Sequence, residues 1–168
     1  MKLVMAVYFG SDGATTAALA FDDWDSAEAG LCYTAHTAQV EKAARGELDL
    51  RALPCLLQLL REHALQPDLI VIDGWVHLDR LATPGLGQHL YQALGGRSAV
   101  IGLSKTARPA LPAQFEVSRD EEAAPLVVTC AGIDLGAAKA RVRAMHGKRR
   151  VPTLLKLAAR LAKADRSD

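Results

Sequence analysis

The sequence predicts an α/β fold in which a mixed β-sheet is flanked by helices on both faces. Three short apolar runs near the start of the chain, at residues 3–9, 15–21 and 30–36, are typical of strands that meander. A Gly-Ser-Asp-Gly segment between the first two runs favours a hairpin turn. Further along, strand-like runs alternate with helical patterns, which favours parallel strands joined by helices. Both kinds of connection together predict a mixed sheet.

The segment PDLIVIDG predicts the centre of this sheet. Its apolar run at residues 69–72 is continuous and ends at Asp73 and Gly74, as expected of a strand buried on both faces. Before it, leucines recur at helical spacing over residues 50–63, and Asp49 is placed to cap that helix. The other expected elements are a helix at 85–94, strands at 98–103 and 125–129, a charged turn at 119–124, and helices near 135–145 and 152–164.

Length and composition predict one compact, soluble domain. The chain has 168 residues, of which 50% are hydrophobic and 23% charged, and this suits one apolar core rather than two domains. We place the domain at residues 1–164 and expect a short polar tail at 165–168. No apolar run approaches the ~20 residues of a membrane-spanning helix, and the start of the chain lacks a signal-peptide pattern. Three cysteines without metal-ligand spacing predict reduced core thiols and a cytoplasmic location: Cys32, Cys55 and Cys130.

The charges are separated along the chain, although they nearly cancel to a formal net charge of +1. Acidic residues gather early, whereas Lys and Arg are frequent from Lys139 to Arg166. A line of cations can contact the phosphates of DNA or RNA, because binding releases counterions. We take Lys148, Arg149 and Arg150 as the candidate nucleic-acid-binding residues. The alternative is that the cations form the solvated faces of two terminal helices.

Several segments resemble the endonuclease V family, whose members cleave DNA or RNA near inosine, the product of adenine deamination. PDLIVIDG is followed by PGLGQHLY and AVIGLSKT, which is similar to the central part of that family. GELDLRALPCLLQLL resembles the preceding segment of a bacterial branch, and PLVVTCAG and MHGKRRVPTLLK resemble its C-terminal part. The resemblance extends from about residue 3 to 161. It implies a ribonuclease H-like fold and a nuclease ancestry in DNA repair.

The resemblance also implies where the catalytic residues should lie. Family members hold Mg²⁺ with three carboxylates: an Asp on the first strand, a Glu at the start of the first helix and an Asp that ends the central strand. Asp73 matches the third carboxylate, and Lys105 matches a lysine near the scissile phosphate. Tyr8 stands in place of the first Asp, and Ala52 stands in place of the Glu, next to a retained Arg51. The chain therefore resembles a divergent bacterial-type member that lacks most catalytic acids.

Two further family motifs have also changed. The Tyr-x-Pro-Gly wedge, whose aromatic ring opens the duplex beside the lesion, falls on residues 43–46, where Ala43 replaces the tyrosine and only the glycine remains. An Arg-Gly-x-Ser turn has become Arg119, Asp120, Glu121 and Glu122. These acids place negative charge where a nucleic-acid backbone would otherwise lie.

Two functional hypotheses follow. In the first, the chain is a catalytically impaired member, a pseudoenzyme that keeps the fold and binds nucleic acid or a protein partner. In the second, it is an active Mg²⁺-dependent endonuclease on inosine-containing DNA or RNA, in which Asp73 works with displaced acids such as Asp12 or Asp49 and with Lys105. Mg²⁺ is a cofactor only if the residual site at Asp73 binds it, and a single carboxylate holds this ion weakly. Neither hypothesis involves a membrane.

Each candidate residue also has a structural alternative. Asp73 would then simply end a buried strand, and Lys105 would be a surface lysine. Tyr8 would fill the emptied metal cavity and bond Asp73 through its hydroxyl. Asp12 fits a hairpin turn, and Asp49 fits a helix cap.

Three residues in the turn after the central strand remain open between two interpretations. Trp75 either stacks on a base or packs under the following helix. His77 and Asp79 either support a site at Asp73 or are satisfied structural residues.

Overall fold

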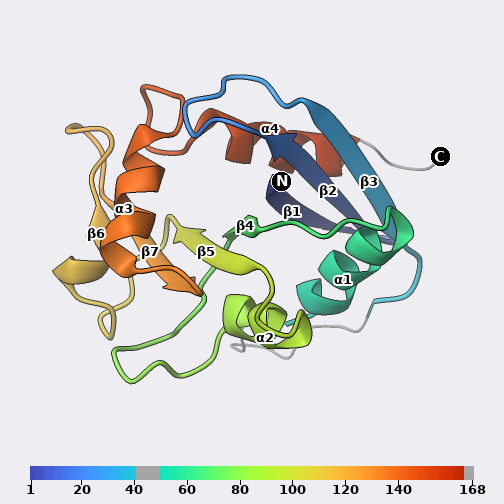
Figure 1. The fold of residues 1–168 in the computed structure, drawn as a ribbon, viewed down its shortest axis with the longest axis horizontal. Helices are drawn as coiled ribbons and strands as arrows, with labels where there is room; N and C mark the ends of the chain where they lie inside the picture. The colour runs from blue at the N-terminus through green and yellow to red at the C-terminus, as the bar shows by residue number, and fades with distance from the viewer. Residues whose placement is uncertain (41–49, 165–168) are drawn as a thin grey trace.

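The computed structural model describes residues 1–40 and 50–164 and contains, within them, one seven-stranded sheet (Figure 1). The strands are β1 (Lys2–Gly10), β2 (Gly13–Phe21), β3 (Leu31–Thr37), β4 (Leu69–Asp73), β5 (Ala99–Ser104), β6 (Glu116–Val117) and β7 (Leu126–Ala131). The helices are α1 (Ala52–Glu62), α2 (Leu86–Ala93), α3 (Leu135–Ala144) and α4 (Thr153–Ala164), with a short 3₁₀ helix η1 (Ala113–Phe115). The predicted α/β fold with a mixed sheet is confirmed.

The sheet has the strand order β3-β2-β1-β4-β5-β7-β6. The first three strands form an antiparallel meander, and β1, β4 and β5 are parallel neighbours at its centre. In this parallel part Met5 lies opposite Ile72, and Asp73 lies opposite Leu103. The carboxyl ends of β1, β4 and β5 therefore meet at one edge of the sheet, where open α/β sheets bind their ligands.

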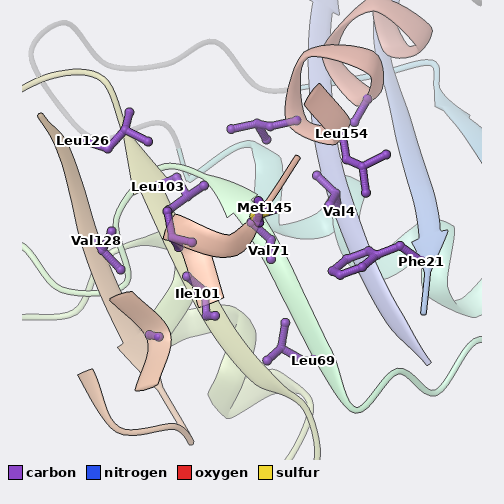
Figure 2. Packing of buried hydrophobic residues seen from close by; sticks show 14 of the residues in the cluster. Val4, Phe21, Leu69, Val71, Ile101, Leu103, Leu126, Val128, Met145 and Leu154 are labelled. Atoms are coloured by element: carbon purple, nitrogen blue, oxygen red, sulfur yellow. The ribbon is translucent and has the colours of Figure 1, made fainter. Parts of the chain in front are cut away.

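Helices cover both faces of the sheet. One face packs against α3 and α4, through residues that include Val4, Val71 and Leu154 (Figure 2). The other face packs against α1 and α2, through residues that include Ile72, Leu56 and Leu90. Alternate residues of β1 and β4 enter opposite cores, because successive side chains of a strand point to opposite faces. Every residue of the run at 69–72 is therefore buried, as expected of a central strand.

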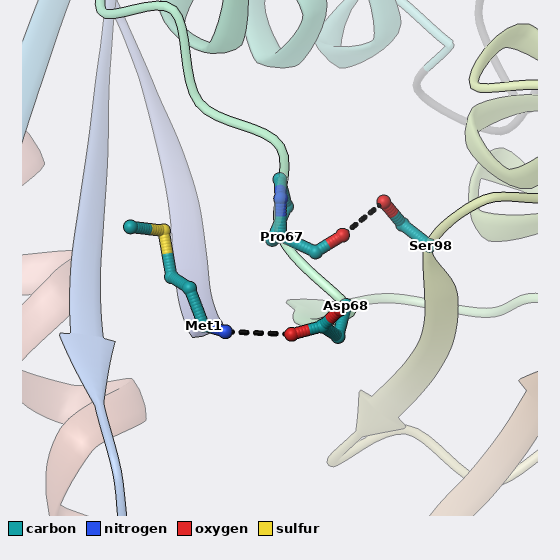
Figure 3. A network of polar contacts seen from close by, with 4 residues as sticks. All are labelled: Met1, Pro67, Asp68 and Ser98. Carbon is teal, nitrogen blue, oxygen red and sulfur yellow. Dashed lines mark hydrogen bonds and ion pairs between the residues drawn. The ribbon is translucent and has the colours of Figure 1, made fainter.

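The amino ends of the three parallel strands are tied together by polar contacts (Figure 3). The amino group of Met1 donates to Oδ2 of Asp68 over 2.6 Å, just before β4. The Ser98 hydroxyl, which is buried at the start of β5, donates to the Pro67 carbonyl over 2.6 Å. The pKa of Asp68 is lowered chiefly by the hydrogen bond from the Met1 amine. These bonds hold the chain entries of β1, β4 and β5 in register.

Two side chains partly cover the outer edge of β3: Gln58 of α1 and His63, the residue that follows this helix. Nε2 of His63 donates to the Thr34 carbonyl over 2.7 Å, and Nε2 of Gln58 donates to the His36 carbonyl over 2.9 Å. Gln58 also accepts a bond of 2.7 Å from the Thr37 hydroxyl. An edge strand with free carbonyls is prone to pair with other chains. These contacts reduce that tendency.

Several details differ from the sequence-based expectations. Cys32 lies exposed on the edge strand β3, so the prediction of core thiols is wrong for this residue, whereas Cys55 is buried and Cys130 half-buried. The segments β6 and η1 were not expected, because both are too short to leave a periodic pattern. The expected Asp49 cap, the motif at residues 43–46 and the tail at 165–168 lie outside the described residues. No helix in the described part of the chain is long and apolar enough to cross a membrane.

Candidate functional site

A cavity of about 550 Å³ opens at the carboxyl ends of β1 and β4. Its lining brings together the three positions that the sequence comparison pairs with the catalytic carboxylates: Tyr8, Ala52 and Asp73. Most of the remaining lining is apolar, with Trp75 and Lys163 among the other residues. Residues distant in sequence therefore share one site, and Asp73 is the one carboxylate among its described lining residues.

The strand register explains how Tyr8 and Asp73 reach this site. Val4, Ala6 and Val71 belong to the core under α3 and α4. Since side chains alternate along a strand, Tyr8 and Asp73 point to that same face, just beyond the end of the core. Ala52 approaches from the opposite face, as the first residue of α1, and is 7% exposed. A methyl group at this position leaves space that a glutamate would occupy.

The Asp73 side chain lies at the rim of the cavity, where part of it is in contact with solvent. Burial raises the pKa of its carboxyl group, and the nearby charge of Lys105 offsets part of the rise. Two backbone amides of the turn that follows Asp73 donate to other acceptors. The amide of Gly74 donates to the Leu103 carbonyl over 2.8 Å, and the amide of Val76 donates to Oγ1 of Thr129 over 2.8 Å.

The expected hydrogen bond from the Tyr8 hydroxyl to Asp73 is also not found among the described residues. Tyr8 is not without a partner, and its half-buried ring lines the cavity. Lys105 does act on Asp73, through its charge. Asp73 is thus a weakly compensated carboxylate at the rim of an apolar cavity.

Lysines surround this carboxylate. A smaller cavity of about 140 Å³ is lined by Asp73, Lys105 and Lys156, and Lys163 borders the larger one. Lys156 and Lys163 lie two helical turns apart on α4, on the face that Ala159 presents to both cavities. The sequence patterns alone do not mark these two residues as site residues. Their seven-residue spacing on an amphipathic helix is the signal that places them together.

The donor chemistry does not fit a tight Mg²⁺ site. Mg²⁺ prefers oxygen ligands in octahedral geometry and is usually held by more than one fixed ligand. Asp73 supplies a carboxylate, Ala52 supplies no donor, and Tyr8 supplies a phenol that is a much poorer ligand while protonated. No group of three or more His, Cys, Asp or Glu residues gathers within residues 1–40 and 50–164. The described residues alone therefore do not form a tight Mg²⁺ site.

The other acidic and histidine candidates have structural partners or positions. Asp12 lies exposed in the turn between β1 and β2 and borders a separate, shallow cavity with Tyr8. Nε2 of His77 lies 3.0 Å from Oε1 of Gln88. Asp79 accepts bonds from residues of its own loop, which lower the pKa of its carboxyl group. None of these three residues lines the cavity at Asp73.

Trp75 both lines the cavity and packs against the chain. Its half-buried ring lies under the guanidinium of Arg108, 5.0 Å from the ring centroid, and Nε of Arg108 donates to the Leu78 carbonyl over 3.1 Å. Nε1 of Trp75 is buried and has no hydrogen-bond partner among the described residues. The ring is therefore held in place by packing and by the cation above it.

The three candidate nucleic-acid-binding residues differ in their environments. Lys148 and Arg149 are exposed. Arg150 is half-buried, and its Nη2 donates to the carbonyls of Lys105 over 2.5 Å and Pro125 over 2.9 Å. Arg150 therefore ties the end of β5 to the start of β7, which is a structural role for its guanidinium.

Arg119, in the turn that differs from the family motif, is structural in the same way. Its guanidinium donates to the carbonyls of Met145 over 2.5 Å, Gly147 over 3.0 Å and Arg150 over 3.4 Å. Burial lowers its pKa, although arginine remains charged throughout the physiological range. The expected charged turn is present, with the Glu122 amide donating to Asp120 over 3.0 Å. Arg119 thus fixes the segment that joins α3 and α4.

The sheet order and the cavity at its carboxyl edge define a ribonuclease H-like α/β protein, and the fold is that of endonuclease V. The endonuclease V structure from Streptomyces avermitilis matches with a TM-score of 0.75 and 22% identity, over 96% of this chain and 79% of that one. The structure from Bacillus subtilis matches with a TM-score of 0.72 and 16% identity, over 97% and 78%. The Ciona intestinalis protein, in complex with a 24mer DNA containing an inosine followed by a ribo-adenosine, gives 0.78 and 13%, over 98% and 84%.

Identities this low establish the fold alone. No family model matches the sequence, and no curated protein matches it. The residues of the site itself are therefore the basis for any functional statement.

Proposed function

We propose that this chain is an endonuclease V-like protein that binds nucleic acid but is impaired in cleaving it. The observation that carries the proposal is the cavity at the carboxyl ends of β1 and β4, where Tyr8 and Ala52 stand beside Asp73, the single carboxylate among the described lining residues. Phosphodiester cleavage of the endonuclease V kind uses bound metal to activate water and to stabilise developing charge. With no further carboxylate among its described residues, this site lacks the ligands that would hold the metal firmly.

The binding part of the proposal rests on charge. Lys105, Lys156 and Lys163 border the site, and Lys148 and Arg149 are exposed on the segment between α3 and α4. Such cations attract phosphates and release counterions on binding. The fold shared with the Ciona intestinalis protein, whose structure contains inosine DNA, supports nucleic acid as the partner. We include a cytoplasmic location, since all three cysteines are free thiols.

The second candidate function is an active Mg²⁺-dependent endonuclease on inosine-containing DNA or RNA, with a role in DNA repair. One observation favours it: Asp12 borders a shallow cavity that also includes Tyr8, so a second carboxylate lies on the same strand end as the site. In this case Asp73, Lys105 and a displaced acid would act together. Asp49 was the other displaced acid considered, and it lies outside the described residues.

A cleavage assay separates the two functions. Purified protein is incubated with inosine-containing single- and double-stranded DNA and RNA in Mg²⁺ or Mn²⁺, beside an Asp73→Ala control. We expect no cleavage above that of the control. Cleavage that depends on the divalent ion and disappears in Asp73→Ala would establish the second function and contradict the first.

A binding assay tests the electrostatic part. We expect weak binding that does not discriminate inosine and falls steeply as salt rises. The double change Lys148→Glu with Arg149→Glu should lower the affinity by ~10-fold or more at low salt, because it reverses two exposed phosphate contacts. Arg61→Glu with Arg97→Glu makes the same charge change at the opposite end of the sheet and should have a much smaller effect. Equal losses in both double variants would mean that net charge alone drives binding.

A further inference from the structure

We infer that the loop between β4 and α2, residues 77–84, is a rigid wedge that inserts Leu81 between the bases of a bound nucleic acid. The inference rests on the proposed nucleic-acid binding and adds a contact that reads base stacking rather than phosphate charge. In Figure 1 this green loop runs along the lower left of the view, away from the sheet.

Leu81 is unusually exposed for a large apolar side chain. Its relative exposure is 90%, compared with 58% for Leu31 and 43% for Leu50. A single exposed leucine on a surface is ordinary. The position of Leu81 at the tip of a fixed loop is what distinguishes it.

The loop is held by a dense set of hydrogen bonds. Oδ1 of Asp79 accepts from the amides of Leu81 over 2.9 Å and Thr83 over 3.1 Å, and Oδ2 accepts from the Thr83 hydroxyl over 2.6 Å. The amide of Leu78 donates to the Thr83 carbonyl over 2.9 Å, and His77 and Pro84 form an antiparallel bridge below the tip. The tip is therefore preorganised, and little conformational entropy remains to be lost when it binds.

The backbone at the tip is also strained. Ala82 has a φ of +60°, in the left-handed region that residues with a Cβ atom avoid. Such conformations persist where the surroundings enforce them, and they cluster at functional sites. Here the contacts of Asp79 and Thr83 on either side enforce the turn that leaves Leu81 without apolar cover.

The loop begins and ends at the candidate site. Trp75 precedes it and Leu86 follows it, and both line the cavity at Asp73. Arg108 connects the base of the loop to that cavity, since it stacks on Trp75 and donates to the Leu78 carbonyl. A strand bound at the cavity would therefore pass beside the loop.

The chemistry of the tip favours a nucleic acid over a lipid surface. Leu81 is the one exposed large apolar residue in the loop at 77–84. Insertion into a membrane requires a broad apolar face instead. Its neighbour Arg80 is exposed and suits a phosphate. Apolar side chains, leucine included, insert between base steps and partially unstack them.

The test is a fluorescence titration with short single- and double-stranded DNA and RNA that carry 2-aminopurine, whose emission rises when it is unstacked. We expect the wild-type protein to raise the emission on binding. Leu81→Ser should abolish most of that rise and weaken affinity by ~5-fold or more, in the range measured for base-contacting side chains. Leu81→Phe, which keeps an insertable apolar group, should retain the rise.

Leu31→Ser is the matched control, because it removes an exposed leucine from β3. This strand is at the edge of the sheet and is separated from β4 by β2 and β1. It should leave both emission and affinity unchanged. Binding without a rise in emission, or a rise that Leu81→Ser leaves intact, would overturn the wedge alone. If the wild-type protein binds none of these nucleic acids, the proposed function and the wedge are both wrong.

Discussion

Asp68 immediately precedes β4 at the amino end of the sheet, and Asp73 ends the same strand at the carboxyl end. The Met1 amine donates to Asp68 and lowers the pKa of its carboxyl group, whereas burial raises the pKa of Asp73. The first carboxylate thus has a fixed partner that favours its charged form. The second is held in a recess where its charge is disfavoured and only partly offset by Lys105.

The same contrast extends to the surroundings of each aspartate. At the amino end, hydrogen bonds from Met1 and Ser98 join the entries of the parallel strands. At the carboxyl end, the side-chain ammonium groups of Lys105 and Lys156 make no hydrogen bond or salt bridge within the described part of the chain, and the buried Nε1 of Trp75 finds no acceptor there. Groups left without partners are characteristic of a site that serves a ligand. Polar groups are therefore paired at the amino end of the sheet, whereas several described polar groups at the carboxyl end are left without a partner.

The strongest way to alter this contrast is to place acids at the two positions that the family resemblance pairs with catalytic carboxylates. Tyr8→Asp combined with Ala52→Glu should create a divalent-ion site with Asp73, because all three positions line one cavity. An ion that binds only the folded state at about 100 times its Kd stabilises by ~2.7 kcal/mol. We expect Mg²⁺ or Mn²⁺ to raise the Tm of this variant by several degrees and that of the wild type by little.

Tyr8→Asn with Ala52→Gln is the control for this experiment, since it has nearly the same shape without the charges. It should show no response to the ion. A strong response of the wild type, or none in a folded Asp-Glu variant, would contradict the assignment of these positions to the old catalytic centre.

A smaller effect is expected at the amino end. Ser98→Ala removes the donor to the Pro67 carbonyl, in a place where the Ser98 side chain is 4% exposed. The loss of such a buried hydrogen bond costs about 1–2 kcal/mol. Thermal unfolding should show a Tm lower by roughly 2–8 °C, whereas Ser118→Ala, at an exposed serine, should not change it. Nucleic-acid binding should be the same in both variants.

The two aspartates should respond to pH with opposite signs. A carboxyl group whose folded pKa is lowered stabilises the fold above its unfolded pKa, and this contribution is lost as pH falls through the folded pKa. Asp68→Asn should therefore lower the Tm at pH 7. A carboxyl group whose folded pKa is raised destabilises the fold increasingly as pH rises from its unfolded pKa through its folded pKa. Asp73→Asn should therefore raise the Tm at pH 7.

The difference for Asp73→Asn should vanish toward pH 3, where its carboxyl group is largely protonated in either state, whereas the difference for Asp68→Asn starts to shrink below its unfolded pKa and is lost only as pH falls through the lowered folded pKa. Unfolding scans at pH 3, 5 and 7 provide the measurement. A Tm of Asp73→Asn below that of the wild type at pH 7 would mean that the charge of Asp73 is better compensated than its surroundings indicate.

The sequence predicts a helix or strand of this fold best where a pattern of apolar residues extends over many positions. The run at residues 69–72 and the leucines of α1 repeat over enough residues to predict their elements, and both are present. Tyr8, Ala52 and Asp73 could be brought together only through the family resemblance, because nothing in their spacing links them. The partners of Arg119 and Arg150 could not be predicted, since these guanidinium groups bind backbone carbonyls, which any sequence supplies.

The smallest expected effects concern two alanines with left-handed backbones, one near each end of the sheet. Ala64, with a φ of +52°, follows α1 and lines a cavity that Asp68 also borders. Ala82, with a φ of +60°, lies in the loop that carries Leu81. Glycine adopts this conformation without the penalty of about 1–2 kcal/mol that a Cβ atom incurs, but it loses more entropy on folding. Either change to glycine should therefore stabilise the fold by only ~0.5 kcal/mol, which denaturant unfolding can resolve.

Their functional consequences should differ, because the two ends of the sheet differ. After α1, the amide of Leu65 donates to the Leu60 carbonyl over 2.9 Å, a bond that ends the helix whichever residue occupies position 64. Ala64→Gly should therefore leave the 2-aminopurine response unchanged. Ala82→Gly relaxes the turn that holds Leu81 outward, so it should reduce that response although it stabilises the protein. If both variants gain stability and keep the full response, backbone strain at Ala82 has no part in presenting Leu81, and the contacts of Asp79 alone set the position of the tip.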